Sequence, residues 1–486
     1  MKLKIVALAL IILMLVPLVC SCNSNGENSS SSEDVLESTT PETSLEDRLN
    51  MDVDYEGMEF KVFTTAQGGR TPTDFECEDM EKVMDNAVYQ KNAIMERNYK
   101  IVISSEKSFG TNNGGYAKIL KQYSSGESDY SMCILAAYDA ANLALEGCFY
   151  DINTLEGIDT TDPWWDQAAN RDLAIADCLF FTHGSLSTIV DDFTYCVVFN
   201  KAIYKAVVGD TAALYQKVTD GKWTLDELGA LSRNVKDDLN GDDIMDSRDR
   251  FGLMIWDNEL IASLNASGNR IASLNEDGEV EFTLYNEVSN ATLEKFITIG
   301  NSDYSINFQH MSSHVSWHNM FSQDQVLMLM SMFNEVERFR DMRTDYGILP
   351  NPKYDETQSY YAPVSLWHSA FICVPFMIDN AESVANIVEL LGYHSMKLLT
   401  PAYYDKTLKG LYVRDDESAA MLDIIFANRI YDVGHIYKVG NVAEHITNLL
   451  RNNRPTGLAS VYEQYRTTTE SEIRGLNMRI KILKNQ

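Results

Sequence analysis

The sequence predicts an α/β protein with two or more domains. The chain has 486 residues and 45% of them are hydrophobic, which is more than one ordinary core holds. Strand-like and helix-like segments alternate from residue 58 to residue 138, an order that predicts a parallel sheet covered by helices on both faces. A second strand-like run at 195–199 is also followed by a helical pattern, and helical patterns dominate from residue 381 onward.

The chain is strongly acidic, with a formal net charge of −31. Such a surface repels the phosphates of nucleic acids and of anionic lipids. The composition therefore argues against a function on DNA or RNA and suits a body held outside the cell.

Residues 1–21 have the pattern of a signal peptide. Two lysines precede an apolar run at 5–19 that is shorter than a usual membrane span. The run ends in the letters VCSC at 19–22, which resemble a bacterial lipobox. We therefore expect Cys22 to be the mature N-terminus and to carry lipid. The alternative is an uncleaved membrane anchor, which would leave the topology of the body unchanged.

Residues 22–54 are expected to form a flexible tether between the lipid and the body. Residues 23–46 consist mostly of Asn, Ser, Glu, Thr and Pro, with almost no large apolar side chains. Such a segment cannot bury enough apolar surface to fold by itself.

Six cysteines remain after this processing. They are Cys77, Cys133, Cys148, Cys178, Cys196 and Cys373. Three of them lie inside apolar strand-like runs, where a buried thiol behaves as a small hydrophobic side chain. An even number outside the cell permits disulfides. No pair has the spacing of a metal site, and we predict free thiols.

The first sheet is predicted from the segments between residues 58 and 138. The strands are 58–65, 99–104 and 130–138, and the helices run from about 79 to 98 and from 117 to 124. Ligands of parallel sheets bind beyond the carboxyl ends of the strands. Gln67, Tyr138 and Asp139 lie at such ends, so we expect them at the rim of a ligand-binding cleft.

Residues 149–196 are expected to cross to a second lobe. They contain the adjacent residues Trp164 and Trp165, which suit either a buried cap over a helix start or a platform that stacks on a sugar ring. A preceding Asp-Pro turn argues for partial exposure, so both alternatives stay open. Asp192 begins the crossing strand, and its carboxylate is a suitable acceptor for sugar hydroxyls.

The segment 192–252 carries the most informative motifs of the chain. The strand-like run ends in FNK at 199–201, GKWTLDEL follows at 221–228, and DLNGDD and DRFG close the segment. Thr224 and Glu227 form a capping box at the start of a helix. These motifs resemble the extracellular solute-binding proteins of ABC importers, in the large family that contains the maltose-binding-protein-like sugar receptors.

The resemblance covers about residues 55–470 and implies a two-lobed periplasmic-binding-protein-like fold, α/β in class, with hinge crossings and a helical C-terminal region. Residues 55–190 with 318–370 are expected in the first α/β lobe, and residues 191–317 with 371–486 in the second. The resemblance further implies a monomeric, lipid-anchored receptor that is not an enzyme. The receptor would bind a small solute, an oligosaccharide by our interpretation, and deliver it to the permease subunits of an ABC importer.

Two other classes stay open. A surface lipoprotein could be a glycoside hydrolase or another carbohydrate-active enzyme, although the sequence contains no nucleophile elbow, zinc-protease helix or phosphate loop. It could also be a structural lipoprotein without a ligand. Fold analogy alone does not transfer function.

Three further tryptophans, Trp256, Trp317 and Trp367, lie near predicted strand ends or crossings. An indole ring can pack on the apolar C–H face of a sugar while neighbouring polar groups bind its hydroxyls. We therefore predict them as ligand-stacking residues. Trp223, in the GKWT turn, is expected to be a packing residue.

The acidic segment 238–249 has the spacing of a calcium loop. The oxygen side chains of Asp238, Asn240, Asp242, Asp246 and Asp249 occupy loop positions 1, 3, 5, 9 and 12, and the carbonyl of Ile244 occupies position 7. The sixth position is Asp243 where glycine is usual, and Asp249 replaces the usual glutamate. We predict a structural Ca²⁺ of weak affinity, and the alternative is a solvated acidic turn.

His310, His314 and His318 recur every four residues. Three imidazoles could bind zinc if the segment were a helix. The serine-rich segment makes a poor helix and supplies no carboxylate in register, so a polar surface is favoured.

Overall fold

The computed structural model describes residues 45–49, 51–65, 72–108, 114–310 and 314–485. The predicted signal peptide, Cys22 and Gln67 lie outside these ranges. The chain divides into two compact units, Met1–Arg48 and Leu49–Gln486. Among the described residues, the first unit contains the short helix α2 (Leu45–Arg48), and the remaining described elements belong to the second. Among the described residues, no helix combines the length and the apolar character that a membrane span requires.

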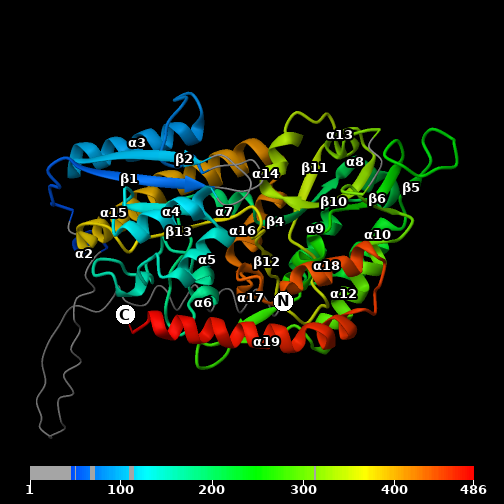
Figure 1. Ribbon diagram of the computed structural model, residues 1–486. Helices are drawn as coiled ribbons and strands as arrows, with labels where there is room; N and C mark the ends of the chain where they lie inside the picture. The colour runs from blue at the N-terminus through cyan, green and yellow to red at the C-terminus, as the bar shows by residue number, and fades with distance from the viewer. Residues whose placement is uncertain (1–44, 50, 66–71, 109–113, 311–313, 486) are drawn as a thin grey trace, which may run out of the picture. The chain divides into compact units, whose positions relative to one another are not determined.

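The first sheet has four strands in the order β13-β3-β1-β2 (Figure 1). β1 pairs in parallel with both β2 and β3, so the predicted sheet is confirmed. The strands are β1 (Met58–Thr65), β2 (Ile101–Ser108), β3 (Met132–Ala136) and β13 (Ala370–Cys373), and the helices are α3 (Val83–Tyr99), α4 (Gly114–Ser125) and α5 (Ala137–Glu146).

Several element boundaries in this sheet differ from the expected ones. Tyr99, expected to open the second strand, is the last residue of α3, and the strand begins at Ile101. Lys100 ends the helix because it takes a left-handed conformation with φ 58°.

β13 joins as an antiparallel edge strand that places Cys373 opposite Cys133. These two and the other four described cysteines are free, which confirms the predicted free thiols.

The second sheet has the order β11-β4-β10-β6-β5, and β9 pairs with β6. β10 is parallel to β6 and antiparallel to β4, and all its side chains are buried. The strands are β4 (Tyr195–Asn200), β5 (Lys236–Asp237), β6 (Arg250–Ile255), β9 (Ser305–Asn307), β10 (Val326–Met332) and β11 (Tyr346–Leu349).

This pairing corrects the expected distribution of the chain between the sheets. β10 and β11 fall in the segment 318–370 that was expected in the first lobe, yet both belong to the second sheet. β13, at the boundary of the segment expected in the second lobe, pairs in the first sheet. A continuous apolar run specifies that a strand is buried, but not which partner it pairs with.

Short helices, a hairpin and a minor strand pair connect these strands. The helix start at Thr224 is confirmed, because its hydroxyl accepts the backbone N–H of Glu227 at 3.3 Å. The elements are η2 (Ile152–Thr154), α6 (Gln167–Leu173), α8 (Lys201–Val207), α9 (Ala212–Thr219), α10 (Leu225–Ser232), α11 (Glu259–Ala266), β7 (Ala272–Leu274), β8 (Val280–Phe282), α12 (Glu287–Gly300), α13 (Trp317–Ser322), α14 (Phe333–Val336), η3 (Glu337–Phe339), β12 (Ala362–Pro363) and β14 (Arg429–Ile430).

Two segments that link the sheets run beside each other. α7 (Ile189–Asp192) leads into β4, and residues 364–369 lead into β13. The backbone N–H of Ser365 donates to the carbonyl of Phe193 at 2.9 Å, which ties the two segments together. They are the crossings expected between two lobes.

The C-terminal part is helical, as predicted. In Figure 1, α15 runs beside α3. Ala402 at the start of η4, a π-helix, packs against Ala87 and Val88 of α3, whereas Tyr403 packs into the core around β10. η4 therefore touches the surroundings of both sheets. The helices are α15 (Ala381–Pro401), η4 (Ala402–Tyr412), α16 (Asp416–Ala427), α17 (Val433–Ile436), η5 (Val439–Asn441), α18 (Val442–Arg451) and α19 (Leu458–Leu483).

Candidate ligand-binding site

The crossings lie at the edge where α/β sheets bind ligands. Met332, at the end of β10, pairs with Tyr195 at the start of β4, so α7 lies at the carboxyl end of β10. Ala136, at the end of β3, likewise pairs with Ala370 at the start of β13. The carboxyl ends of strands in both sheets therefore lie next to the crossings, where a ligand is expected.

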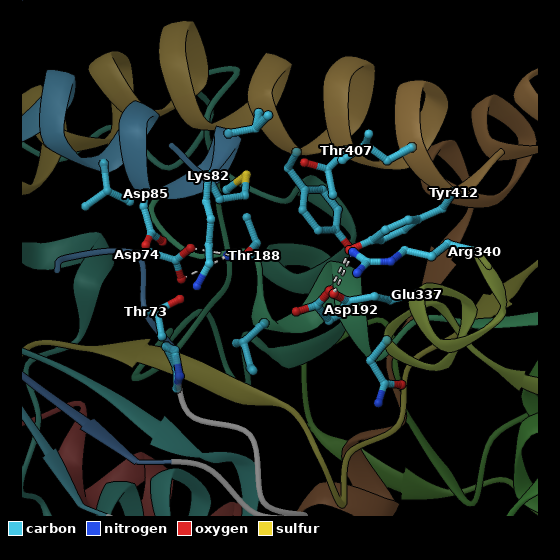
Figure 2. A pocket seen from close by; sticks show the side chains of 18 of the residues that line it. Thr73, Asp74, Lys82, Asp85, Thr188, Asp192, Glu337, Arg340, Thr407 and Tyr412 are labelled. Carbon is cyan, nitrogen blue, oxygen red and sulfur yellow. Dashed lines mark hydrogen bonds and ion pairs between the residues drawn. The ribbon is translucent and has the colours of Figure 1, made fainter. Parts of the chain in front are cut away.

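A cavity of about 520 Å³ opens at this edge, and we call it the α3–α7 pocket (Figure 2). Its size lies within the range of small-molecule sites. Its lining comes from the segment after β1, the start of α3, α7, the segment after β10, and η4. The polar and charged residues are Thr73, Asp74, Glu81, Lys82, Asp85, Thr188, Asp192, Asn334, Glu337, Arg340, Tyr403, Thr407 and Tyr412.

Asp192 and Tyr403 form a polar pair on the wall of this pocket. The phenol hydroxyl of Tyr403 donates to Oδ1 of Asp192 at 3.0 Å, and only 6% of Asp192 is exposed. Asp192 ends α7, and Tyr403 belongs to η4. A crossing and the C-terminal region therefore meet at one hydrogen bond on the pocket wall. The prediction placed Asp192 at a ligand site and missed its partner.

Asp74 forms the opposite part of the wall. Its carboxylate accepts hydrogen bonds from the hydroxyls of Ser187 at 2.9 Å and of Thr188 at 3.0 Å. It also accepts the backbone N–H of Thr188 at 3.2 Å. Figure 2 shows Asp74 and Thr188 side by side, with Asp192 farther along the pocket. The segment after β1 is thereby fastened to the start of α7.

Lys82 and Arg340 bring positive charge to the pocket from different elements. Lys82 precedes α3, and Figure 2 shows it on the side of Asp74, whereas Arg340 lies on the side of Tyr412. The guanidinium of Arg340 lies 3.9 Å from Glu337 and 3.6 Å from Asp341. The pocket therefore combines cations, carboxylates and hydroxyls with the apolar faces of tyrosines, as a polyhydroxylated ligand would need.

Trp256, Phe308 and Trp317 form a row of rings, the aromatic row. The ring centroids of Trp256 and Phe308 are 6.4 Å apart with planes 9° apart, and those of Phe308 and Trp317 are 4.7 Å apart with planes 14° apart. Trp317 also stacks on His318, whose Nε2 lies 2.9 Å from Glu335. Glu335 adjoins and binds Asn334, which lines the α3–α7 pocket, so a chain of contacts through His318 and α14 links the row to the pocket.

A second, smaller cavity of about 140 Å³ lies between Tyr138 and Trp367, and we call it the Tyr138–Trp367 pocket. The two rings meet edge to face with centroids 6.2 Å apart, and 40% of Trp367 is exposed. The ammonium of Lys438 lies 3.8 Å from the centroid of the Tyr138 ring. Two residues that were predicted separately as ligand contacts therefore share one cavity.

Solved structures of ABC solute-binding proteins are similar to this chain in fold. The lacto-N-biose-binding protein of an ABC transporter from Bifidobacterium longum matches with a TM-score of 0.58 and 8% identity over 87% of this chain and 99% of that one. An ABC substrate-binding protein from Listeria monocytogenes in complex with cycloalternan matches with a TM-score of 0.53 and 13% identity over 88% of this chain and 100% of that one. A maltodextrin-binding domain from Bdellovibrio bacteriovorus bound to maltotriose also has a TM-score of 0.53 and 13% identity, over 86% of this chain and 100% of that domain. This chain has the two-lobed fold of ABC solute-binding proteins. No protein-family model and no curated protein sequence matches it.

Within this solute-binding fold, Trp164 and Trp165 are core residues. They are 1% and 3% exposed. The indole N–H of Trp165 donates to Oε1 of Glu389 at 2.8 Å, and Trp164 packs so closely on Gly392 that a Cβ there would lie 2.3 Å from its ring. Both side chains pack against α15, a contact that no local pattern reveals. Of the two alternatives left open for this pair, the stacking platform is wrong and the buried cap holds.

Asp139 and Trp256, which were predicted as ligand contacts, are both buried, with 6% and 9% of each residue exposed. Asp139 lies in the first turn of α5, and burial raises the pKa of its carboxyl. The indole N–H of Trp256 donates to Oε1 of Glu259 at 2.7 Å, and burial raises the pKa of Glu259 well above its ordinary value. Trp256 is therefore the buried end of the aromatic row, and the half-buried Phe308 and Trp317 are more exposed.

In the acidic segment 238–249, carboxylates bind backbone N–H groups and an arginine. Asp243, at the sixth position, takes the left-handed conformation that the loop requires, with φ 61°. Oδ1 and Oδ2 of Asp238 accept the N–H groups of Gly241 and Asp243 at 2.7 and 2.8 Å. The guanidinium of Arg248 lies 2.9 Å from Asp242 and 2.6 Å from Asp246.

No His, Cys, Asp and Glu side chains gather in threes or more as a possible metal site within the described ranges. Calcium binding at 238–249 therefore stays a prediction, and it requires Arg248 to leave the carboxylates. The three histidines do not converge either. His310 lies 2.9 Å from Asp257, His314 lies 3.7 Å from Asp246, and His318 contacts Glu335.

Proposed function

We propose that the protein is a lipid-anchored receptor outside a bacterial cell that binds an oligosaccharide and delivers it to an ABC importer. The observation that carries this proposal is the α3–α7 pocket, where Asp192 and Tyr403 face a cavity of about 520 Å³. The fold supports it further, because the solved structures with this fold named above are sugar-binding proteins.

The chemistry of the pocket suits a sugar. Sugar hydroxyls need donors and acceptors, which Asp192, Thr188 and Arg340 supply, and sugar C–H faces need apolar surface, which the tyrosine rings supply. The aromatic row and the Tyr138–Trp367 pocket offer further ring surface near the crossings. An extended ligand of several sugar units would use more of this surface than a monosaccharide would.

Lipid attachment at Cys22, the permease subunits as partners and a monomeric state complete the proposal. The lipobox-like letters at 19–22 support the anchor. A tether between the lipid and the body would let the body reach both the solute and a membrane-bound permease.

The test is a titration of the processed chain without its lipid, read by isothermal calorimetry and by tryptophan fluorescence. The panel consists of maltotriose, lacto-N-biose, cycloalternan, free amino acids and short peptides. We expect one or more oligosaccharides to bind stoichiometrically and to be recovered unchanged. Binding of peptides alone would contradict the carbohydrate assignment, and steady hydrolysis of a sugar would make the protein an enzyme.

Tyr403→Phe and Tyr404→Phe are a matched pair of variants for this titration. Tyr403 donates to Asp192 in the pocket, whereas the hydroxyl of its neighbour Tyr404 donates to Asp423 and does not line the pocket. We expect the first substitution to weaken sugar binding about threefold to tenfold, the effect of one hydrogen bond. The second should leave it unchanged.

A further inference from the structure

A fully buried lysine lies behind the wall of the α3–α7 pocket. Lys91, in the middle of α3, has no exposed surface. Its ammonium donates to the backbone carbonyl of Asp74 at 2.6 Å and lies 4.2 Å from the centroid of the Phe75 ring. Buried lysines are rare because the charge loses its hydration. An apolar side chain would fill this position of a helix at lower cost.

The next residue of α3 holds the same segment. The side-chain amide of Asn92 donates to the backbone carbonyl of Phe75 at 3.0 Å. Two consecutive side chains of α3 therefore bind two consecutive carbonyls of the segment that forms the pocket wall. No strand pairing fixes this segment in the sheet, so these contacts determine where its side chains point.

From Asp74 the contacts continue to the ligand side of the pocket. The carboxylate of Asp74 binds the hydroxyl and the N–H of Thr188. Thr188 immediately precedes α7, and α7 ends at Asp192, which binds Tyr403. A shift of Asp74 would therefore be transmitted to Thr188 and Asp192 through direct contacts.

We infer that Lys91 is a positioning residue of the binding site, which holds Asp74 and through it Thr188 and Asp192, and that loss of its charge weakens ligand binding. This inference rests on the proposed function for its ligand. An ammonium donates a stronger hydrogen bond to a carbonyl than a neutral amine does, so the protonation of Lys91 sets how firmly the wall is held.

Few other groups titrate around Lys91. Burial lowers the pKa of Lys91 to about 8 against the opposing attraction of Asp74. Burial, together with the nearby Lys91, lowers the pKa of His394 to about 4, so His394 is neutral throughout the relevant range. Burial also raises the pKa of Tyr99, the hydrogen-bond partner of His394. Among these groups, Lys91 is the one that changes charge between pH 7 and pH 9.

The first experiment uses the unmodified chain and needs no ligand. Amide hydrogen exchange is followed at Thr188, whose N–H binds Asp74, at pH 7 and pH 9. We expect the protection factor of this amide, corrected for intrinsic exchange, to fall severalfold at pH 9. The amides of β10 should keep theirs. An unchanged protection factor at Thr188 would overturn the inference.

The second experiment compares Lys91→Met with Lys121→Met, a lysine exposed on the surface of α4. With an oligosaccharide that the unmodified chain binds, we expect Lys91→Met to weaken affinity about tenfold at pH 7 and to remove its dependence on pH. Its Tm should be equal or higher, because an unfavourable buried charge is gone. A lower Tm with unchanged affinity would show a merely structural lysine. If no sugar binds the unmodified chain, the proposed function fails and the exchange experiment alone decides the role of Lys91.

Discussion

The guanidinium of Arg429 forms an ion pair with Asp166, with 3.0 Å between Nε and Oδ2. Its other end binds Asp191, which precedes the pocket residue Asp192. Asp166 caps α6, and Arg429 belongs to β14. This largely buried cluster therefore ties the crossing that carries Asp192 to two other parts of the chain.

Replacement of Arg429 by Met should destabilise the protein strongly. The substitution leaves two carboxylates beside an apolar side chain, and removal of one partner from a buried pair costs about 3 kcal/mol or more. Urea unfolding at pH 7 measures the loss. Arg466→Met removes the exposed pair with Glu470 and should change stability by less than about 1 kcal/mol. Equal effects of the two substitutions would contradict the role given to Arg429.

The same cluster should make the protein sensitive to acid. Burial raises the pKa of Asp166 and Asp191, but the charge of Arg429 outweighs burial and holds both pKa values below the ordinary range. The stability they contribute is present above the unfolded pKa of about 4 and is lost as the pH falls through the lower folded values. Unfolding measured from pH 7 to pH 3 should therefore show a steeper loss for the unmodified chain than for Arg429→Met. Parallel curves would contradict this.

Trp367 should contribute to ligand affinity by stacking. Its exposed ring lies beside Tyr138 at the smaller cavity. Trp367→Ala should weaken sugar binding by about 1–3 kcal/mol, or roughly tenfold to hundredfold. Tyr285→Ala, a change at another exposed aromatic residue, is the control. If calorimetry finds equal affinities, the ligand does not reach this cavity.

Calcium should raise the Tm if the segment 238–249 binds it. The comparison is between millimolar Ca²⁺ and EDTA, because loops of this kind outside cells bind weakly. Arg248→Gln removes the cation that now binds Asp242 and Asp246, so it should enlarge the calcium effect, and Asp242→Ala should abolish it. If the unmodified chain and both variants have the same Tm in calcium and in EDTA, the segment is an acidic turn that does not bind calcium.

Cys22→Ala should prevent lipid attachment. The variant should be released into the medium or remain unprocessed, and intact mass should lack the lipid. Membrane fractionation in the original host measures both. Unchanged fractionation and mass would refute the lipidation site.

Sequence patterns predicted individual strands, helices and some site residues, but not which distant segments contact one another. The alternation from residue 58 to 138 predicted the first sheet, and strand ends placed Tyr138 near a cavity, because these signals are local. Tyr403 and Asp74 were missed. Each meets its partner only through contacts between distant segments, and neither has a distinctive neighbour pattern. The burial of Trp164 depends likewise on Gly392 of α15.

A crystal structure of the protein with a bound oligosaccharide from the titration panel would locate the binding site directly. We expect the sugar in the α3–α7 pocket, with a hydroxyl within hydrogen-bond distance of Asp192 and a ring face on an aromatic side chain. A sugar bound elsewhere, with Asp192 and Tyr403 unchanged and solvent in the pocket, would contradict the assignment of the α3–α7 pocket as the binding site.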